Sequence, residues 1–177
     1  MFKNNHIANW LGKEVDGKQV YEAINIIWVD YLSETDIEAK EKIKEFLENN
    51  SFKTREGSST GYFTFMGEST QLKKIRQHPT DKTWSDGKSV SDNNHGRIFT
   101  NKDNTGNAFY TLGAFSREKG ISHKFISFNV ARNALHPTGN WVYEGMSITI
   151  PNIYQTGVQN GFSTKDHDGV FIFVLYP

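Results

Sequence analysis

The sequence contains no cysteine, and this absence removes three kinds of chemistry at once. Disulfide bonds, thiolate zinc sites and cysteine nucleophiles all need the sulfur that the chain lacks. A membrane-spanning helix is also missing, because the longest apolar stretch lies near Ala23–Val29, whereas spanning takes roughly 20 residues. The N-terminal residues 1–14 lack the apolar core of a signal peptide. We therefore expect a soluble protein without membrane insertion, and the sequence leaves its compartment and oligomeric state open.

The chain also lacks an excess of charge of either sign, since 20 Lys and Arg residues balance 20 Asp and Glu residues. A balanced chain exerts no long-range attraction on a polyanion, so duplex nucleic acid is not an expected partner. The phosphate-binding Gly-rich loop, the His-Glu-x-x-His metal motif and the Gly-x-Ser-x-Gly nucleophile motif are all absent. We expect no metal and no cofactor, although a local basic patch would suffice to bind a small anionic ligand.

What the chain does contain is a high share of aromatic residues and many short β-patterned segments. Aromatic residues make up 14% of the 177 positions and hydrophobic residues 36%, which supplies a core and favours sheet structure. The length fits a single domain, residues 1–177, with an N-terminal arm at 1–22 and a long polar loop at 78–94.

The strands are predicted from β-branched and aromatic runs bounded by turn residues. They are Ala23–Tyr31, Phe52–Arg55, Gly61–Met66, Arg97–Thr100, Ala108–Ser116, Trp141–Ile150 and an interior strand at Val170–Tyr176. The strands at 97–100 and 108–116 flank a polar tip and predict a hairpin. Gln71–Gln77 is expected to form a helical turn.

Two main helices are predicted. The first begins at Ser33 or Thr35 and ends at Asn49–Asn50. Its apolar stripe comprises Ile37, Ala39, Ile43, Phe46 and Leu47. The second follows Ser127, a possible N-cap, and directs Val130, Ala131, Ala134 and Leu135 inward. Few helices and many turn-linked strands predict an α+β fold, with a mainly antiparallel sheet and the two helices packed on one face.

Three of the six histidines lie in strongly polar contexts just before a predicted element, where scaffolds often present functional groups. The first context is Asn94-His95-Gly96-Arg97. His95 is able to act as acid, base or ligand, Gly96 lets a backbone approach a ligand closely, and Arg97 is suited to hold an anion. The competing interpretation is a loop cap and a surface ion pair.

The other two contexts surround His123 and His167. His123 precedes the helix that carries Arg132, and His167 lies between two aspartates ahead of a glycine. An Asp-Gly pair before an apolar strand is more often simply a turn. Trp84 lies in the polar loop and is the aromatic residue whose burial we least expect, so it is a candidate for stacking on a ligand ring. Asp30, at the end of the first strand, is a further position where sheets often place ligands.

Two His-Pro-Thr segments, at His78 and His136, fit the His-x-Thr element of two-histidine phosphoesterases. In that family each pair lies on a strand, and proline is poorly tolerated inside a sheet. We therefore interpret both as chance matches.

Three short motifs follow one another in the order found in a known family. They are His95-Gly96-Arg97-Ile98-Phe99, the Ala-Phe-Ser-Arg of Ala114–Arg117, and Ile121-Ser122-His123. With the strand and helix before them, they make the region Ala23 to Leu135 resemble the C-terminal domain of bacterial LssY-type proteins. The resemblance implies no particular activity and points to the same histidines.

Three functions are compatible with these residues. The favoured one is binding of a small polar or phosphorylated ligand at an edge lined by His95, His123, Arg97, Arg132 and Asn94, with His167 and Trp84 as further members. An enzyme is the second, a metal-independent hydrolase or phosphodiesterase in which His95 and His123 act as acid and base. The third is a structural or interaction domain. Binding is favoured because it needs neither a nucleophile nor a metal set.

Overall fold

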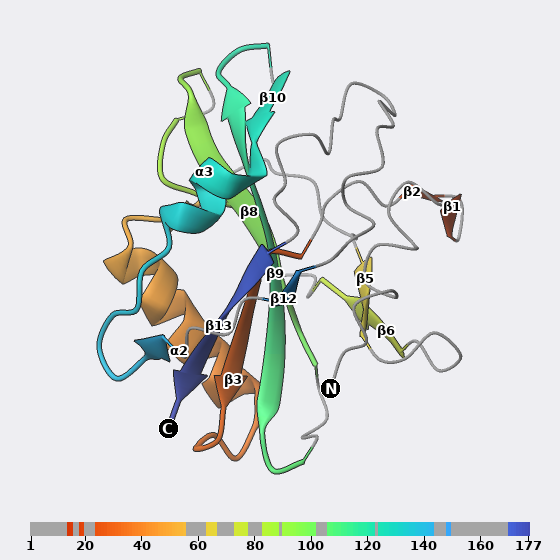
Figure 1. Cartoon of the computed structure of the whole chain (residues 1–177), viewed down its shortest axis with the longest axis vertical. Coiled ribbons are helices and arrows are strands. Elements are labelled where there is room, and N and C mark those ends of the chain that lie inside the picture. The colour runs from red at the N-terminus through yellow and green to blue at the C-terminus, as the bar shows by residue number, and fades with distance from the viewer. Residues whose placement is uncertain are drawn as a thin grey trace.

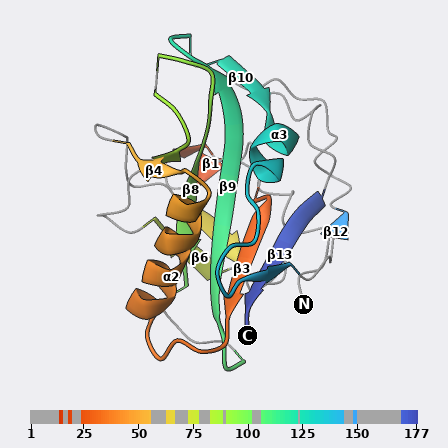
Figure 2. The ribbon, with the colours of Figure 1, turned by 90° about the vertical axis from the view of Figure 1, so that its left-hand side faces the viewer.

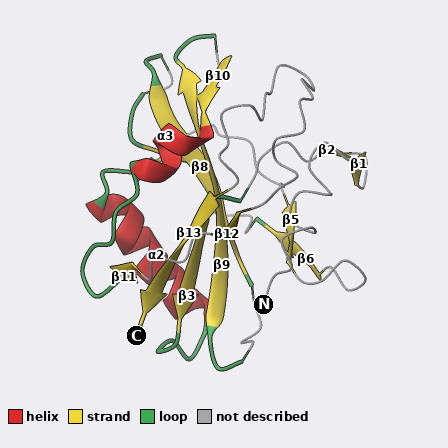
Figure 3. Cartoon of the chain, in the orientation of Figure 1, coloured by secondary structure: helices red, strands yellow, loops and turns green. Residues whose placement is uncertain are grey.

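The computed structural model describes residues 14–15, 18–19, 24–55, 63–66, 73–77, 83–88, 90–101, 106–122, 124–143, 148–149 and 170–177. A nine-stranded sheet dominates this part of the chain, together with two helices (Figures 1 and 3). The sheet strands are β3 (Ile26–Asp30), β4 (Lys53–Thr54), β7 (Trp84–Ser85), β8 (Asn93–Thr100), β9 (Phe109–Lys119), β10 (Lys124–Ser127), β11 (Val142–Tyr143), β12 (Ile148–Thr149) and β13 (Val170–Tyr176). The helices are α2 (Asp36–Asn49) and α3 (Phe128–Asn133). Two separate pairs are β1 (Glu14–Val15) with β2 (Lys18–Gln19), and β5 (Phe63–Met66) with β6 (Lys73–Arg76).

The strand order is β11-β13-β3-β9-β8-β7-β4, and β10 and β12 pair with β9 and β13 respectively. The pairing of β13 with β3 is parallel, and the other described pairs are antiparallel. The β8–β9 pair runs from Asn93 opposite Glu118 to Thr100 opposite Thr111, which confirms the predicted hairpin. The α+β class with a mainly antiparallel sheet is thus confirmed.

Helix α2 begins where the second capping register predicts. Thr35 is the N-cap, and its Oγ1 accepts a hydrogen bond from the Glu38 backbone N at 3.2 Å. Glu38 Oε2 accepts a hydrogen bond from the Glu34 backbone N at 2.8 Å, one residue before the N-cap. The predicted stripe is buried except for Ile37, which is 69% exposed. At about 100° per residue, Ile37 faces away from Ala39, so its assignment to the stripe is wrong.

The core is aromatic and lies between α2, α3 and the sheet. Trp28 of β3 makes edge-to-face contacts with Phe46 of α2 at 5.6 Å and with Phe115 of β9 at 6.2 Å between ring centroids. Ala131 of α3 belongs to the same cluster. Val130, predicted to point inward, is instead 47% exposed, because it lies on the side of α3 opposite the buried Phe128.

A buried asparagine marks the point where β9 diverges from β3. Asn25 is fully buried, and its Nδ2 donates to the Phe115 carbonyl at 2.7 Å, while its Oδ1 accepts from the Phe115 backbone N at 3.1 Å. The Asn25 side chain thereby makes the two hydrogen bonds to the Phe115 backbone that a neighbouring strand would otherwise make. Beyond it, β9 pairs with β10 on that side, and this half of β9 carries Ser116 and Glu118.

Two predictions for the region between α2 and β8 need correction. Lys73–Arg76 is a strand paired with β5 and not part of a helical turn. Within 78–94, predicted as a loop, β7 pairs with both β4 and β8, and β8 already begins at Asn93. These short polar strands form because a neighbouring strand supplies hydrogen-bond partners, which local sequence does not reveal.

Candidate functional site

Buried polar side chains share one face of β8 and β9. On β8, Asn93, His95 and Arg97 alternate with residues of the other face and are 1%, 9% and 7% exposed. The register places Ser116 opposite His95 and Glu118 opposite Asn93, and directly opposed residues lie on the same face. Buried strand positions are usually apolar, so a polar strip here indicates a specific role.

Arg55 joins this strip from the edge of the sheet. Its backbone N donates to the Thr83 carbonyl at 2.8 Å, which continues the β4–β7 pairing by one residue. The guanidinium Nη2 donates to Ser85 Oγ at 3.0 Å and to Asn93 Oδ1. Nη1 lies 3.4 Å from Glu118 Oε1. Side chains from three different strands therefore hold one guanidinium in place.

Glu118 also approaches His95. The same Oε1 atom lies 3.6 Å from His95 Nδ1. This separation is too long for a good hydrogen bond, but it is short enough for an ion pair when the imidazole is protonated. Glu118 is 8% exposed, so its carboxylate lies between two cationic or ionisable groups in a largely dry environment.

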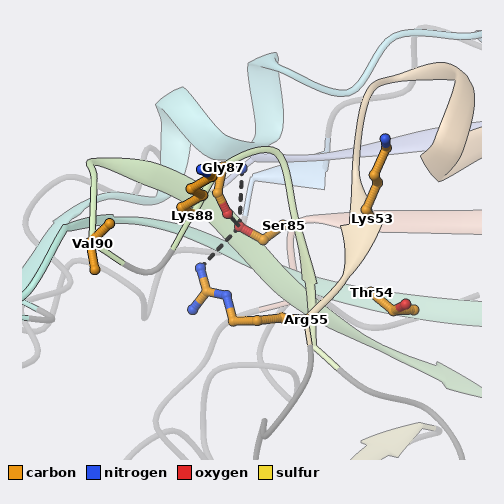
Figure 4. Close-up of a pocket in the computed structure, with 7 residues that line it drawn as sticks. All are labelled: Lys53, Thr54, Arg55, Ser85, Gly87, Lys88 and Val90. Atoms are coloured by element: carbon orange, nitrogen blue, oxygen red, sulfur yellow. Dashed lines mark hydrogen bonds between the residues drawn. The ribbon is translucent and has the colours of Figure 1, made fainter.

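A cavity of about 400 Å³ opens at this edge of the sheet. Its lining consists of Lys53, Thr54, Arg55, Ser85, Gly87, Lys88 and Val90 (Figure 4). In Figure 4 the Arg55 guanidinium points toward Ser85, while the Lys53 side chain extends away from both. The volume lies within the range of small-molecule sites.

The loop between β7 and β8 is held by its own hydrogen bonds. The Lys88 carbonyl accepts from the Ser91 backbone N and from Ser91 Oγ, both at 3.1 Å. Ser85 Oγ donates to the Gly87 carbonyl at 2.9 Å. The backbone of Lys88 is therefore fixed, while its side chain is exposed beside the cavity.

The two aspartates of the same loop, Asp86 and Asp92, accept hydrogen bonds from residues that do not line the cavity. Asp86 accepts from the Asn94 backbone N at 2.7 Å and from Asn94 Nδ2 at 2.6 Å. Asp92 accepts from the Gly120 backbone N at 3.3 Å. Neither aspartate lines the cavity. Asn94, predicted as a ligand-binding residue, thus has its amide occupied within the fold.

Of the predicted residues, His95 and Arg97 lie together on the polar face of β8, and His95 connects to the cavity through Glu118 and Arg55. Trp84 is 4% exposed and belongs to the hydrophobic core, so the expectation that it would be exposed is wrong. Its strand partner is Gly96. A Cβ at Gly96 would lie 2.4 Å from the Phe115 ring. The close approach that Gly96 permits is therefore made by Phe115 and not by a ligand.

Arg132 lies in α3, where its Nε donates to Asn133 Oδ1 at 3.2 Å, and it does not line the cavity. His123 and His167 lie outside the described residues, so their convergence with His95, and the acid–base pair of His95 and His123, stay predictions. His78 also lies outside the described residues. His136 is exposed and follows α3 outside any strand.

Asp30 has a structural role at the end of β3. Its carboxylate accepts from the Leu32 and Ser33 backbone N atoms at 2.9 and 3.0 Å and from Lys42 Nζ at 3.1 Å. Burial raises the pKa of Asp30, but the hydrogen bonds from Ser33, Leu32 and Lys42 outweigh it and hold the pKa below its usual value. These contacts fix the turn into α2.

The residues that sequence reasoning missed line the cavity, hold Arg55 or lie close to His95. They are Lys53, Arg55, Ser85, Lys88, Asn93 and Glu118. A signal for some of them exists, since Asn93, His95 and Arg97 alternate at a period of two, as Ser116 and Glu118 do. Such alternation predicts one polar face on each strand, but the register between strands is needed to bring the two sets together.

No three histidine or carboxylate side chains cluster as metal ligands in the part of the chain that the structure describes. Nor does any helix there have the length and apolarity to cross a membrane. The expectations of no metal and no cofactor stay predictions.

Comparison of the chain with protein family models, with curated proteins and with solved structures finds no match. The resemblance to the LssY-type C-terminal domain is therefore neither supported nor contradicted.

Proposed function

We propose that the protein binds a small anionic ligand, such as a phosphorylated metabolite, in the cavity beside β4 and β7. One observation carries the proposal: three basic side chains, Lys53, Arg55 and Lys88, line a cavity in which Arg55 is held by Ser85, Asn93 and Glu118. A held guanidinium loses little conformational freedom on binding, so it is a stronger anion site than a mobile surface arginine.

The charge of the lining supports a dianion. Among the described residues, the three basic side chains of the lining are accompanied by one carboxylate, Glu118 beside Arg55, which leaves two positive charges in excess when His95 is neutral. A phosphate monoester carries about −1.5 to −2 charges at neutral pH, which matches that excess. Among the described residues, no carboxylate forms an ion pair with Lys53 or Lys88.

The two helices contribute residues to the apolar core and not to the cavity lining. Phe46 of α2 and Ala131 of α3 belong to the same core cluster as Trp28, and in Figure 2 α2 is drawn across β8 and α3 beside β9. The polar strip of Asn93, His95 and Arg97 lies on the alternate face of β8 from Ile98, which packs in that cluster. The strip is thereby kept out of the apolar core.

The test is to titrate the full chain with inorganic phosphate and with a panel of phosphorylated small molecules. Isothermal calorimetry measures the affinity, and the shift of the melting temperature reports binding independently. Lys88→Ala should weaken binding by roughly 10- to 150-fold, because a charge-assisted hydrogen bond contributes about 1.5–3 kcal/mol. Lys88 is exposed and its backbone makes the loop contacts, so the variant should fold normally.

The matched control is Lys44→Ala on α2. It removes the same charge at a position outside the cavity lining, where Lys44 pairs with the exposed Glu41 at 3.2 Å. Its affinity should equal that of the unmodified chain. Equal weakening in both variants would show that net charge alone is responsible, and absence of binding to every anion would overturn the proposal.

A further inference from the structure

Glu118 lies between the anion-binding Arg55 and His95, and all three groups belong to the polar face of the sheet. Its Oε1 is 3.4 Å from Arg55 Nη1 and 3.6 Å from His95 Nδ1. One carboxylate oxygen is therefore shared by a permanent cation and by a side chain that gains charge near neutral pH.

We infer that binding of a dianion at Arg55 transfers the pairing of Glu118 from Arg55 to His95 and is accompanied by uptake of a proton on His95. This inference rests on the proposed anion site and adds its regulation by pH. It concerns an equilibrium protonation and requires no covalent step.

The physical reason is the burial of Glu118. At 8% exposure its negative charge needs nearby positive charge, because an uncompensated buried charge is strongly unfavourable. In the ligand-free protein the Arg55 guanidinium provides part of that charge. A dianion on Arg55 cancels this contribution, and a proton on His95 restores it at a distance of 3.6 Å.

Within the part of the chain that the structure describes, the other charged groups on this face act in a definite direction. Two positive charges oppose a positive charge on His95. One is Arg97, two residues along β8 on the same face, and the other is Arg55, which directly follows β4. Glu118, from β9, favours it. An anion at Arg55 reduces one of the two opposing charges, so binding and protonation of His95 favour each other. By linkage, affinity should rise as the pH falls through the titration range of histidine.

The probe is sulfate, because sulfate stays a dianion between pH 6 and 8 and any pH dependence then belongs to the protein. Calorimetric titrations at both pH values, each in two buffers with different heats of ionisation, measure affinity and proton uptake directly. Because two coupled binding equilibria typically change each other by about 5- to 150-fold, we expect binding at pH 6 to be at least about fivefold tighter than at pH 8. The buffer dependence should show net proton uptake.

His95→Gln should abolish the proton uptake and flatten the pH dependence, while Glu118→Gln should tighten binding at pH 8, because the competing carboxylate charge is gone. His136→Gln, at an exposed histidine outside the cavity, is the matched control and should leave both unchanged. The calorimetry of the unmodified chain decides the question even where a variant folds poorly.

The outcomes separate the two proposals. Sulfate binding without proton uptake, or with a pH dependence that persists in His95→Gln, overturns the linkage and leaves the anion site standing. Failure of sulfate and phosphate to bind at either pH overturns the anion site itself.

Discussion

At the scale of single residues, a glycine in β8 makes room for an aromatic ring. Gly96 pairs with Trp84 on one side and with Phe115 on the other. A Cβ at this position would lie 2.4 Å from both the Ala114 carbonyl oxygen and the Phe115 ring. The two faces of β8 therefore differ: Gly96 packs toward the core, while His95 and Arg97 lie on the polar face.

Gly96→Ala should therefore destabilise the fold by about 3 kcal/mol, because neither a backbone carbonyl nor a buried ring is able to move away freely. Urea unfolding followed by tryptophan fluorescence would measure this. Gly106→Ala is the comparison: its Cβ would meet nothing within 4 Å, and only its φ of 63° is unfavourable, so we expect about 1 kcal/mol. A loss at Gly96 no larger than that at Gly106 would contradict the packing explanation.

Sequence reasoning at this scale singled out His95 and Arg97 but not the Arg55–Glu118 pair that lies beside His95. A histidine and an arginine in a polar segment are visible one by one. The guanidinium of Arg55 and the carboxylate of Glu118 are 63 residues apart in the chain, and only the pairing of β4, β7, β8 and β9 joins them. Trp84 was misplaced for the same reason, since its burial depends on pairing with Gly96.

At the scale of elements, helix boundaries were readable because capping is local. Thr35 accepts from the Glu38 backbone N, and Ser127 accepts from the Val130 backbone N at 3.0 Å. The interior strand β13 was also predicted, because a continuous apolar run is typical of a strand buried between neighbours. Short polar strands such as β7 carry no comparable signal.

Thr35→Ala should lower the stability of the protein by about 1 kcal/mol, since an N-cap hydroxyl satisfies a backbone donor that alanine leaves without a protein acceptor. Chemical denaturation followed by far-UV circular dichroism reports the change. Thr35→Ser keeps the hydroxyl and should restore most of the lost stability. If Thr35→Ser were as unstable as Thr35→Ala, the hydroxyl would not be the cause.

At the scale of the whole molecule, β3 and β13, the first and last strands of the nine-stranded sheet in chain order, lie next to each other. β13 lies between β11 and β3, and its parallel register runs from Ile172 opposite Ile26 to Tyr176 opposite Asp30. Val174 is fully buried in the same core as Trp28. Strand β3 therefore pairs with β9 on one side and with β13, which is distant in the sequence, on the other.

Deletion of residues 170–177 should abolish cooperative unfolding, because it exposes the backbone of β3 and opens the aromatic core. Near-UV circular dichroism during a thermal scan would show this as a lost transition. Deletion of the exposed Pro177 alone should leave the transition intact. A sharp transition in the longer deletion would mean that β13 is dispensable for the core.

The sequence by itself determined the α+β class, the antiparallel hairpin of β8 and β9, the Ser127 cap of α3, two candidate caps for α2 and the exclusion of cysteine chemistry. Each of these depends on composition or on residues within a few positions of one another. The tertiary structure alone decided that Trp84 is core, that Gly96 serves Phe115, and that Arg55, Ser85, Asn93 and Glu118 converge beside His95. The physical reason is that strand register, which places distant residues on one face, is fixed by pairing between segments and not by the residues of either segment alone.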